Sequence, residues 1–193
     1  MRVLVACEKS RRVASAFEKL GHYAVSCDIL PAEQEGNHIQ DDVLKHLNDG
    51  WDLMIAHPDC TYLAYSGVRW LHERPERWQK LKDATDFFKA LLNADIPKIA
   101  IENPIPHKYA IEQIGRKYDE IIQPWQFGDM ETKATCLWLK GLPLLVPQIT
   151  KKPEGVKQSV WREPPGINRK ANRSRTFQGI AEAMATQWGV ESL

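Results

Sequence analysis

Hydrophobic and polar positions follow two patterns along the chain, short apolar runs and longer segments with apolar residues three or four positions apart. The apolar runs predict strands at 2–7, 23–28, 52–57, 98–101, 120–123 and 135–139. The other pattern predicts helices at 10–21, 41–48, 75–92, 109–117 and 176–188. Because strands alternate with helices, the chain is expected to form an α/β fold with a doubly wound, mostly parallel sheet of the Rossmann-like type.

No position inside the chain has the composition of a linker, so the pattern predicts one domain over residues 1–193. Residues 140–175 are rich in proline and are expected to be mostly loop, followed by a closing helix at 176–188. Within this segment, 151–175 holds eight Lys or Arg residues against two Glu. It is expected either to be a solvated surface loop or to meet phosphates.

Composition narrows the class of protein. Hydrophobic residues make up 43% and charged residues 26%, which is typical of a globular chain. The N-terminal apolar run is too short for a signal peptide and no run approaches the length of a membrane span, so we expect a cytoplasmic protein without membrane contact. The four cysteines lack CxxC spacing, and neither a disulfide framework nor a metal site is expected. A net charge of +1 argues against wrapping a long duplex by charge alone.

Two apolar runs end in residues that carry chemistry. Cys60 follows 52–57 after the turn His57-Pro-Asp, and Glu102 with Asn103 follows 98–101. The carboxyl ends of strands in open α/β sheets form ligand sites, so Cys60 and Glu102 are expected to share a cleft as catalytic residues. Asn103 is expected either to bind substrate or to form a hydrogen bond within the loop. His57 is expected either to face a ligand or to be a strand-end histidine whose hydrogen bonds are satisfied within the protein.

Three further residues have a structural and a functional interpretation. Asp28 ends the second predicted strand, where nucleotide-binding sheets place the acid that bonds ribose hydroxyls, or it forms a turn. Asp42 is either a ligand-facing acid or a helix N-cap. Cys7 ends the first strand and, like Cys27, is interpreted from its residue type as a buried core thiol.

Together these stretches resemble the DNA cytosine carbon-5 methyltransferases. His57-Pro-Asp-Cys60 resembles the family's Pro-Cys loop, and Glu102-Asn-Pro104 resembles its Glu-Asn-Val segment. Ser26-Cys-Asp28 and Gln40-Asp-Asp-Val43 resemble its ribose and adenine segments. The whole chain is similar to short phage and prophage proteins labelled as cytosine methylases, through Ala-His-Pro-x-Cys-Thr, Ile-Glu-Asn-Pro, Lys-Ala-Thr-Cys-Leu-Trp-Leu and Arg-Ser-Arg-Thr-Phe.

The resemblance implies a Rossmann-like methyltransferase fold without a separate target-recognition domain, and S-adenosylmethionine as cofactor. Cys60 would attack carbon 6 of a pyrimidine and Glu102 would hold ring N3. The residues expected at the cofactor are Cys7, Glu8, Asp28, Asp42 and His57. The residues expected at the substrate are Thr61, Ser66, Asn103, Lys133, Arg173 and Arg175, the last three as stand-ins for the family's arginine-rich motif. The partner would be DNA, single-stranded nucleic acid or a free nucleotide, in a bacterial host or phage-infected cell.

Two departures keep an alternative open. The segment Ala6-Cys-Glu-Lys-Ser-Arg-Arg12 has no glycine where the family has a glycine-rich cofactor loop. Asp59 precedes Cys60 directly, and its negative charge is expected to raise the pKa of the thiol. The alternative is a methyltransferase-derived phage protein that binds or hydrolyses a nucleotide without methyl transfer.

Overall fold

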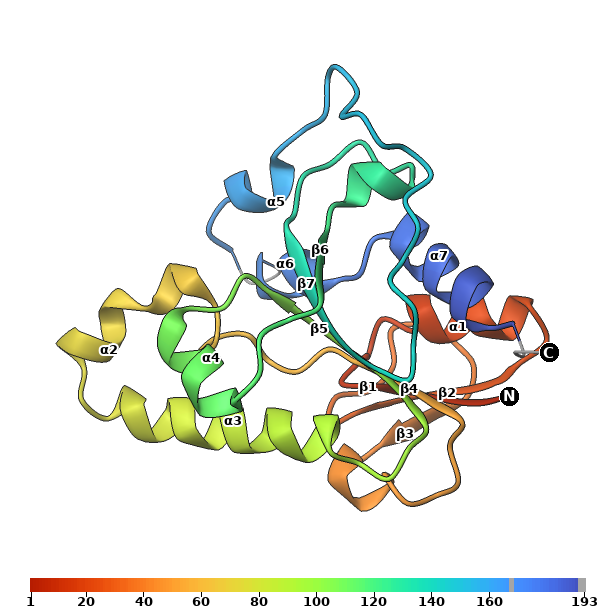
Figure 1. Cartoon of the computed structure of the whole chain (residues 1–193), viewed down its shortest axis with the longest axis horizontal. Helices are drawn as coiled ribbons and strands as arrows, with labels where there is room; N and C mark the ends of the chain where they lie inside the picture. The colour runs from red at the N-terminus through yellow and green to blue at the C-terminus, as the bar shows by residue number, and fades with distance from the viewer. Residues whose placement is uncertain (167–168, 191–193) are drawn as a thin grey trace.

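The computed structural model describes residues 1–166 and 169–190, so residues 167–168 and 191–193 of the predicted domain lie outside the described residues. The chain forms a seven-stranded sheet in the order β3-β2-β1-β4-β5-β7-β6 (Figure 1). The strands are β1 (Arg2–Ala6), β2 (Tyr23–Asp28), β3 (His38–Gln40), β4 (Leu53–Ala56), β5 (Lys98–Pro104), β6 (Glu120–Ile122) and β7 (Thr135–Lys140). The α-helices are α1 (Arg12–Lys19), α2 (Arg69–Glu73), α3 (Arg77–Leu92), α4 (Lys108–Ile114), α5 (Ser159–Arg162), α6 (Arg169–Ser174) and α7 (Gln178–Trp188).

The predicted doubly wound sheet is confirmed. The neighbours β1–β2, β1–β4, β2–β3 and β4–β5 are all parallel. The strand β7 runs antiparallel to both β5 and β6. Chain order reverses direction between β1 and β4, so the carboxyl ends of these two strands flank the point where α/β sheets bind ligands.

Two helical layers cover the sheet, and alternate residues of each strand face one layer or the other. Leu4, Met54 and Ile99 belong to the core shared with α3 and α4. Val5 and Leu53 belong to the core shared with α1 and α7. The predicted buried stripe of the long helix is observed, with Trp78 half-buried and Leu81, Thr85, Phe88 and Leu92 buried.

The pattern of hydrophobic and polar residues did not predict the short helices and the short edge strand. The predicted helix 41–48 is only a 3₁₀ turn, Val43–Lys45, and the unpredicted edge strand β3 precedes it. The predicted loops also contain α2, α5 and α6. Elements of three to six residues show too few positions for a hydrophobic period, and their existence depends on the neighbours they contact.

The start of α1 differs from the sequence prediction. The predicted helix 10–21 begins at Arg12, and its N-cap residue Arg11 makes no side-chain hydrogen bond to the helix end. The Ser10 hydroxyl accepts the Arg12 N–H at 3.5 Å. The Glu8 carboxylate also accepts hydrogen bonds from the backbone N–H groups of Val13 at 2.8 Å and Ala14 at 3.3 Å. Glu8 therefore satisfies the unpaired amides of the first turn from a position upstream of the helix.

The loop between β1 and α1 bends without glycine. Cys7 and Arg11 both have φ of 58°, the left-handed region that is unfavourable for side chains with a Cβ atom. The Arg11 side chain is fully buried and bonds the Glu18 carboxylate and the backbone carbonyls of Glu35 and Asn37. These bonds offset the backbone strain of about 1–2 kcal/mol per residue.

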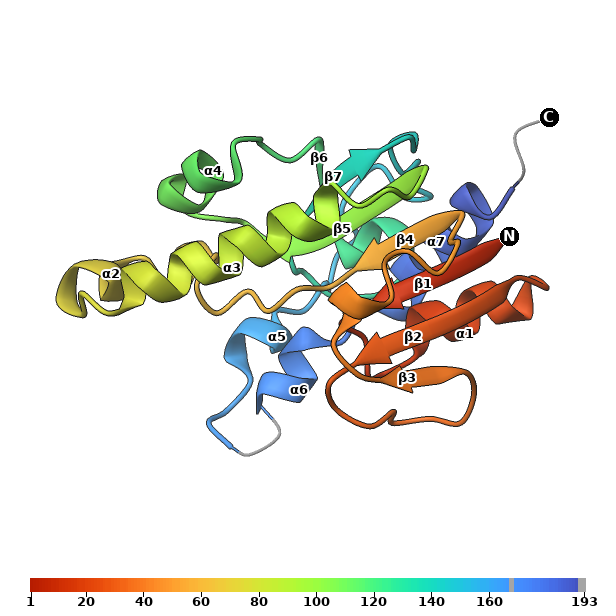
Figure 2. The ribbon, with the colours of Figure 1, turned by 90° about the horizontal axis from the view of Figure 1, so that it is seen from below.

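The described part of the chain contains no helix with the length and apolarity needed to cross a bilayer. Figure 2 shows α5 and α6 lying outside the two helical layers, beyond the arrowhead ends of the sheet. The segment that carries them therefore approaches the strand ends from which the candidate residues project.

Candidate functional site

A large cavity opens at the carboxyl ends of β1, β2, β4 and β5. Its volume is about 1470 Å³, and every candidate residue predicted from the sequence borders it. These residues are Cys7, Glu8, Asp28, Asp42, His57, Cys60, Thr61, Ser66, Glu102, Asn103, Lys133, Arg173 and Arg175. Since a cleft for one small molecule measures roughly 300–1,000 Å³, this cavity has room for two ligands.

We divide the cavity into two sides. The β2 side is formed by Cys7, Glu8, Asp28 and Asp42, and the β5 side by His57, Cys60, Glu102, Asn103 and Lys133.

On the β5 side, Cys60 lies in a compact turn. Its backbone carbonyl accepts the N–H groups of Leu63 at 3.0 Å and Ala64 at 2.9 Å. Thr61 is drawn back to Asp59, whose Oδ1 accepts both the backbone N–H and the hydroxyl of Thr61. The turn fixes Cys60 at the cavity wall, and the thiol is partly exposed.

The environment of Cys60 disfavours the thiolate. Burial raises the pKa of the Cys60 thiol, and the negative charges of Asp59 and Glu102 raise it further, against a lowering by Lys133. The effect expected of Asp59 is therefore present, although burial contributes more. At neutral pH the free protein holds Cys60 as a thiol.

Strand register brings Glu102 to His57. Ala56 of β4 pairs with Ile101 of β5. His57 follows Ala56 and Glu102 follows Ile101, so His57 and Glu102 lie side by side. Nδ1 of His57 and Oε2 of Glu102 lie 2.9 Å apart, and each side chain is only 8% exposed. Burial alone would raise the pKa of Glu102, but the Lys133 charge and the His57 hydrogen bond outweigh it, and the pKa lies below its ordinary value.

Glu102 does not end its strand, as the sequence suggested. The strand β5 continues to Pro104, because β7 pairs with it beyond the end of β4 and matches Glu102 with Leu137 and Asn103 with Cys136. Asn103 is 1% exposed, and its Nδ2 donates to the Pro58 carbonyl at 3.1 Å. Asn103 thus holds the turn that leads to Cys60, which is the loop role considered for it, and it also borders the cavity.

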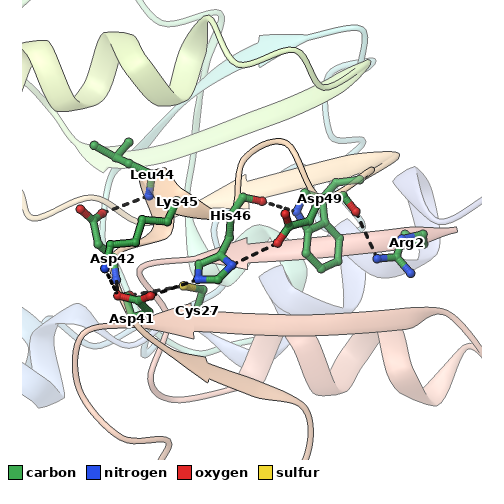
Figure 3. A network of polar contacts seen from close by, with 9 residues as sticks. Arg2, Cys27, Asp41, Asp42, Leu44, Lys45, His46 and Asp49 are labelled. Atoms are coloured by element: carbon green, nitrogen blue, oxygen red, sulfur yellow. Dashed lines mark hydrogen bonds and ion pairs between the residues drawn. The ribbon is translucent and has the colours of Figure 1, made fainter.

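On the β2 side, each aspartate uses one oxygen in local structure. Asp28 Oδ1 accepts the Leu30 N–H at 2.9 Å, and Asp42 Oδ1 accepts the Leu44 N–H at 3.0 Å (Figure 3). Both structural interpretations from the sequence are therefore correct for one oxygen of each carboxylate. Both residues also border the cavity, so their ligand roles stay predictions that depend on the second oxygen.

The two cysteines of this region are protonated. Burial and the Asp28 charge raise the pKa of Cys7 to about 12, and burial raises the pKa of Cys27 to about 11. Cys27 is fully buried, as interpreted from its residue type, and its thiol donates to the Asp41 carbonyl at 3.5 Å (Figure 3). Cys7 is partly exposed and is limited to van der Waals or weak hydrogen-bond contact with a ligand.

The segment around α6 closes the remaining wall of the cavity. Arg169, Arg173 and Arg175 border the cavity, so the basic stretch meets the strand ends rather than open solvent alone. Arg175 pairs with Glu33 at 3.0 Å, and Glu33 also pairs with Lys9 at 3.1 Å. This Lys9–Glu33–Arg175 bridge ties the segment to the loop after β1.

Sequence analysis missed Lys9, Glu33 and Arg169 as cavity residues. Lys9 and Glu33 lie in irregular segments that show no periodicity, and Arg169 is one of many basic residues in its stretch. The sequence contains no signal that distinguishes them from solvated surface charges.

No protein-family model matches the chain, and no curated protein matches it in sequence. Among solved structures, it is similar to a protein described as a candidate DNA modification methyltransferase encoded within a prophage of E. coli. That likeness has a TM-score of 0.50 and 13% identity, and covers 79% of this chain and 52% of that one. It is also similar to the Entamoeba histolytica methyltransferase EhMeth, with a TM-score of 0.47 and 15% identity over 87% of this chain and 61% of that one. The chain spans about half the length of the prophage protein and shares its Rossmann-like fold.

Proposed function

We propose that the protein transfers the methyl group of S-adenosylmethionine to carbon 5 of a pyrimidine, with cytosine as the expected base. The observation that carries this proposal is the joint position of Cys60 and Glu102 on one side of a two-ligand cavity whose other side holds Asp28 and Asp42. A nucleophile and a ring-binding carboxylate beside an acidic adenosine site are the groups that this reaction needs.

The negative charge of the β2 side matches the positive charge of S-adenosylmethionine. S-adenosylmethionine supplies a methyl group on a positively charged sulfonium and contains no phosphate. Asp28 and Asp42 provide negative charge and hydroxyl acceptors there, and the first-turn amides of α1 are filled by the Glu8 carboxylate. Because a helix N-terminus is the usual phosphate site after the first strand, its occupation by Glu8 favours a ligand without a phosphate at this point.

On the β5 side, the chain would act on the pyrimidine ring. Cys60 would lose its proton to water and form an S–C6 bond, and the electron pair of the C5–C6 double bond would move to carbon 5. Carbon 5 would take the methyl group, with S-adenosylhomocysteine as the leaving group. Loss of the carbon-5 proton to water would then re-form the double bond and break the C6–S bond. Cys60 would leave as a thiolate and regain a proton from solvent. Glu102 would hold N3 and share in its protonation, with Lys133 balancing its charge.

The basic wall supports a phosphate-bearing substrate. Arg169 and Arg173 border the cavity opposite the strand ends, where they would meet phosphates beside the target base. A base inside duplex DNA would have to be flipped out of the stack to enter the cavity. Duplex DNA, single-stranded nucleic acid and free nucleotides are the substrate classes to compare.

A second candidate function rests on the state of Cys60. Its raised pKa is unfavourable for a nucleophile, and the left-handed residues Cys7 and Arg11 replace the glycines expected at a cofactor loop. These observations favour a protein that binds or hydrolyses a nucleotide without methyl transfer. It would bind nucleotides in the same cavity and would not require Cys60.

The deciding experiment measures methyl transfer from labelled S-adenosylmethionine to duplex DNA, single-stranded DNA and pyrimidine nucleotides. Cys60→Ala should abolish transfer and leave cofactor affinity by calorimetry unchanged, because the thiol reacts with the base and not with the cofactor. The matched control is Cys136→Ala, a buried cysteine of β7 outside the cavity. Absence of both transfer and cofactor binding in the wild type would contradict the proposal and favour the nucleotide pocket.

A further inference from the structure

His107, the residue that precedes α4, contacts the turn of residues 60–64, which we call the Cys60 turn. Its backbone N–H donates to the Leu63 carbonyl at 3.0 Å, and Nε2 of its side chain lies 2.9 Å from the Tyr62 carbonyl. His107 is 1% exposed and is not among the described residues that border the cavity, whereas Tyr62 borders it. His107 therefore supports the Cys60 turn from outside the cavity.

Both ring nitrogens of His107 form hydrogen bonds within the protein. The Ala110 N–H donates to Nδ1 at 3.1 Å, which makes His107 the N-cap residue of α4. Because Nδ1 accepts, the proton of the neutral ring is on Nε2, which donates to the Tyr62 carbonyl. One neutral tautomer thus joins the first turn of α4 to the Cys60 turn.

A second proton on the ring would disrupt this arrangement. The Nδ1–H of an imidazolium would face the Ala110 N–H, so a buried donor would have no acceptor. Ala110 would keep only its other bond, to the His107 carbonyl at 3.1 Å. Burial lowers the pKa of His107, and the backbone hydrogen bonds of the ring oppose this only in part. The neutral ring is therefore the form present at neutral pH.

The charged and titratable neighbours of His107 also favour its neutral form. The Tyr109 ring lies 6.0 Å from the imidazole, and His72 and Lys108 both contact Tyr109. On the side of the Cys60 turn, the Arg77 guanidinium lies 4.6 Å from the centre of the Tyr62 ring. A cation near the imidazole disfavours a second positive charge, as burial does.

We propose that His107 is a positioning residue whose neutral ring holds the Cys60 turn in place at the cavity wall. The inference rests on the proposed function only in treating Cys60 as the reacting group. When the ring is protonated or its donor is removed, the turn should open and Cys60 should become more accessible. The contacts of Asn103 with Pro58 and of Arg77 with Thr61 remain, so we expect a partial release.

The test measures the rate at which Cys60 reacts with dithiodipyridine, a disulfide reagent that modifies thiols in mild acid as well as at neutral pH. Peptide mapping isolates Cys60, and each rate is divided by that of glutathione at the same pH. The variants His107→Asn and His107→Gln separate the two bonds of the ring. Asparagine caps α4 but is too short to reach Tyr62, whereas glutamine places an amide N–H near the position of Nε2 and does not ionise.

At neutral pH, His107→Asn should react about two- to tenfold faster than the wild type, the change expected for loss of one neutral hydrogen bond. His107→Gln should stay within about twofold of the wild type. Since the pKa of His107 lies below its ordinary value of 6.5, the wild-type rate should rise only as the pH falls below 6.5. His107→Gln should lack this rise down to about pH 5. His72→Asn, at an exposed histidine of α2, is the matched control and should follow the wild type.

Two results would overturn the inference: a His107→Asn rate equal to that of the wild type, or the same pH profile for the wild type and His107→Gln. Nitrogen-15 NMR of the wild type, which needs no variant, would also overturn it by showing the His107 proton on Nδ1 at neutral pH. The thiol assay uses neither S-adenosylmethionine nor nucleic acid. The expected profiles without methyl transfer would reject the proposed reaction and leave the inference standing. Methyl transfer with Cys60 rates that the variants do not change would do the reverse.

Discussion

The two sides of the cavity use polar residues in different ways. On the β2 side, Asp28 and Asp42 each accept a hydrogen bond from a backbone N–H of the next turn with one carboxylate oxygen. On the β5 side, His57 and Asn103 bond neighbouring groups through one end, and at the other end each has a buried polar atom without a partner among the described residues. The first pattern stabilises the loops at the strand ends whether or not a ligand is bound. The second is unfavourable without a ligand.

This difference changes how the candidates should be tested. A substitution on the β2 side changes a turn and a ligand contact together, so a loss of binding alone does not identify the role. On the β5 side, the unpaired atoms contribute nothing to local structure, and their removal reports on the ligand. The predictions below follow from this contrast, in order of decreasing effect.

After the complete loss expected for Cys60→Ala, the largest expected effect is that of Glu102→Gln on methyl transfer. The amide can still accept from His57 Nδ1 and keep the pair in place, but it has no carboxylate to share a proton with the ring. The rate should fall by about 100- to 10,000-fold, the range for an acid–base group, in single-turnover assays. Glu112→Gln, on the exposed face of α4, is the control. A loss of less than threefold, on the order of 1 kcal/mol or below, would show that Glu102 is a structural partner of His57.

Asp28 tests the β2 side. Asp28→Ala should weaken S-adenosylmethionine or S-adenosylhomocysteine binding by about 1.5–3 kcal/mol, the value of a charged hydrogen bond, as measured by calorimetry. Asp28→Asn keeps an oxygen for the Leu30 N–H and removes the charge. If Asp28 binds the ribose as a carboxylate, both variants lose affinity. Full affinity in Asp28→Asn would leave Asp28 as a turn former.

Asp59 tests the state of the nucleophile. A raised pKa means that the reactive thiolate of Cys60 appears at higher pH than for an ordinary cysteine, so alkylation by iodoacetamide at neutral pH should be slow. Asp59→Asn removes one of the charges that raise the pKa and should shift the profile to lower pH, with up to about tenfold faster alkylation at neutral pH. Peptide mapping by mass spectrometry isolates Cys60 from the other thiols. An unchanged profile, with Asp83→Asn as control, would mean that burial alone sets the pKa.

The smallest expected effect concerns the Lys9–Glu33–Arg175 bridge. Its side chains are 25–36% exposed, so water screens their attraction. Glu33→Gln should lower the free energy of unfolding by about 1 kcal/mol at most, or about 2–4 °C in Tm, with a smaller effect at high salt. Calorimetry at low and high salt checks this. A larger loss would show that the bridge contributes to the fold and does more than tie the α6 segment to the loop after β1.

Much of the fold was determined by the sequence. The runs at 2–7, 23–28, 52–57 and 98–101 are buried in their interiors and partly exposed at their ends. Their short length and flanking turn formers favour strands over helices. The spacing of Leu81, Thr85, Phe88 and Leu92 defines one face of α3 for the same reason. The placement of Cys60 and Glu102 on one cavity also followed, because the parallel strands β4 and β5 run toward the same edge of the sheet.

Tertiary structure alone decided three features of the site. The pairing of His57 with Glu102 depends on the β4–β5 register, which no local pattern encodes. The extension of β5 past Glu102 required β7 to pair from the other side. The capping of α1 by Glu8 depends on the left-handed backbone at Cys7 and Arg11, where the buried Arg11 side chain holds residues far along the chain. Each feature joins residues distant in sequence, so its energy appears only when the chain has folded.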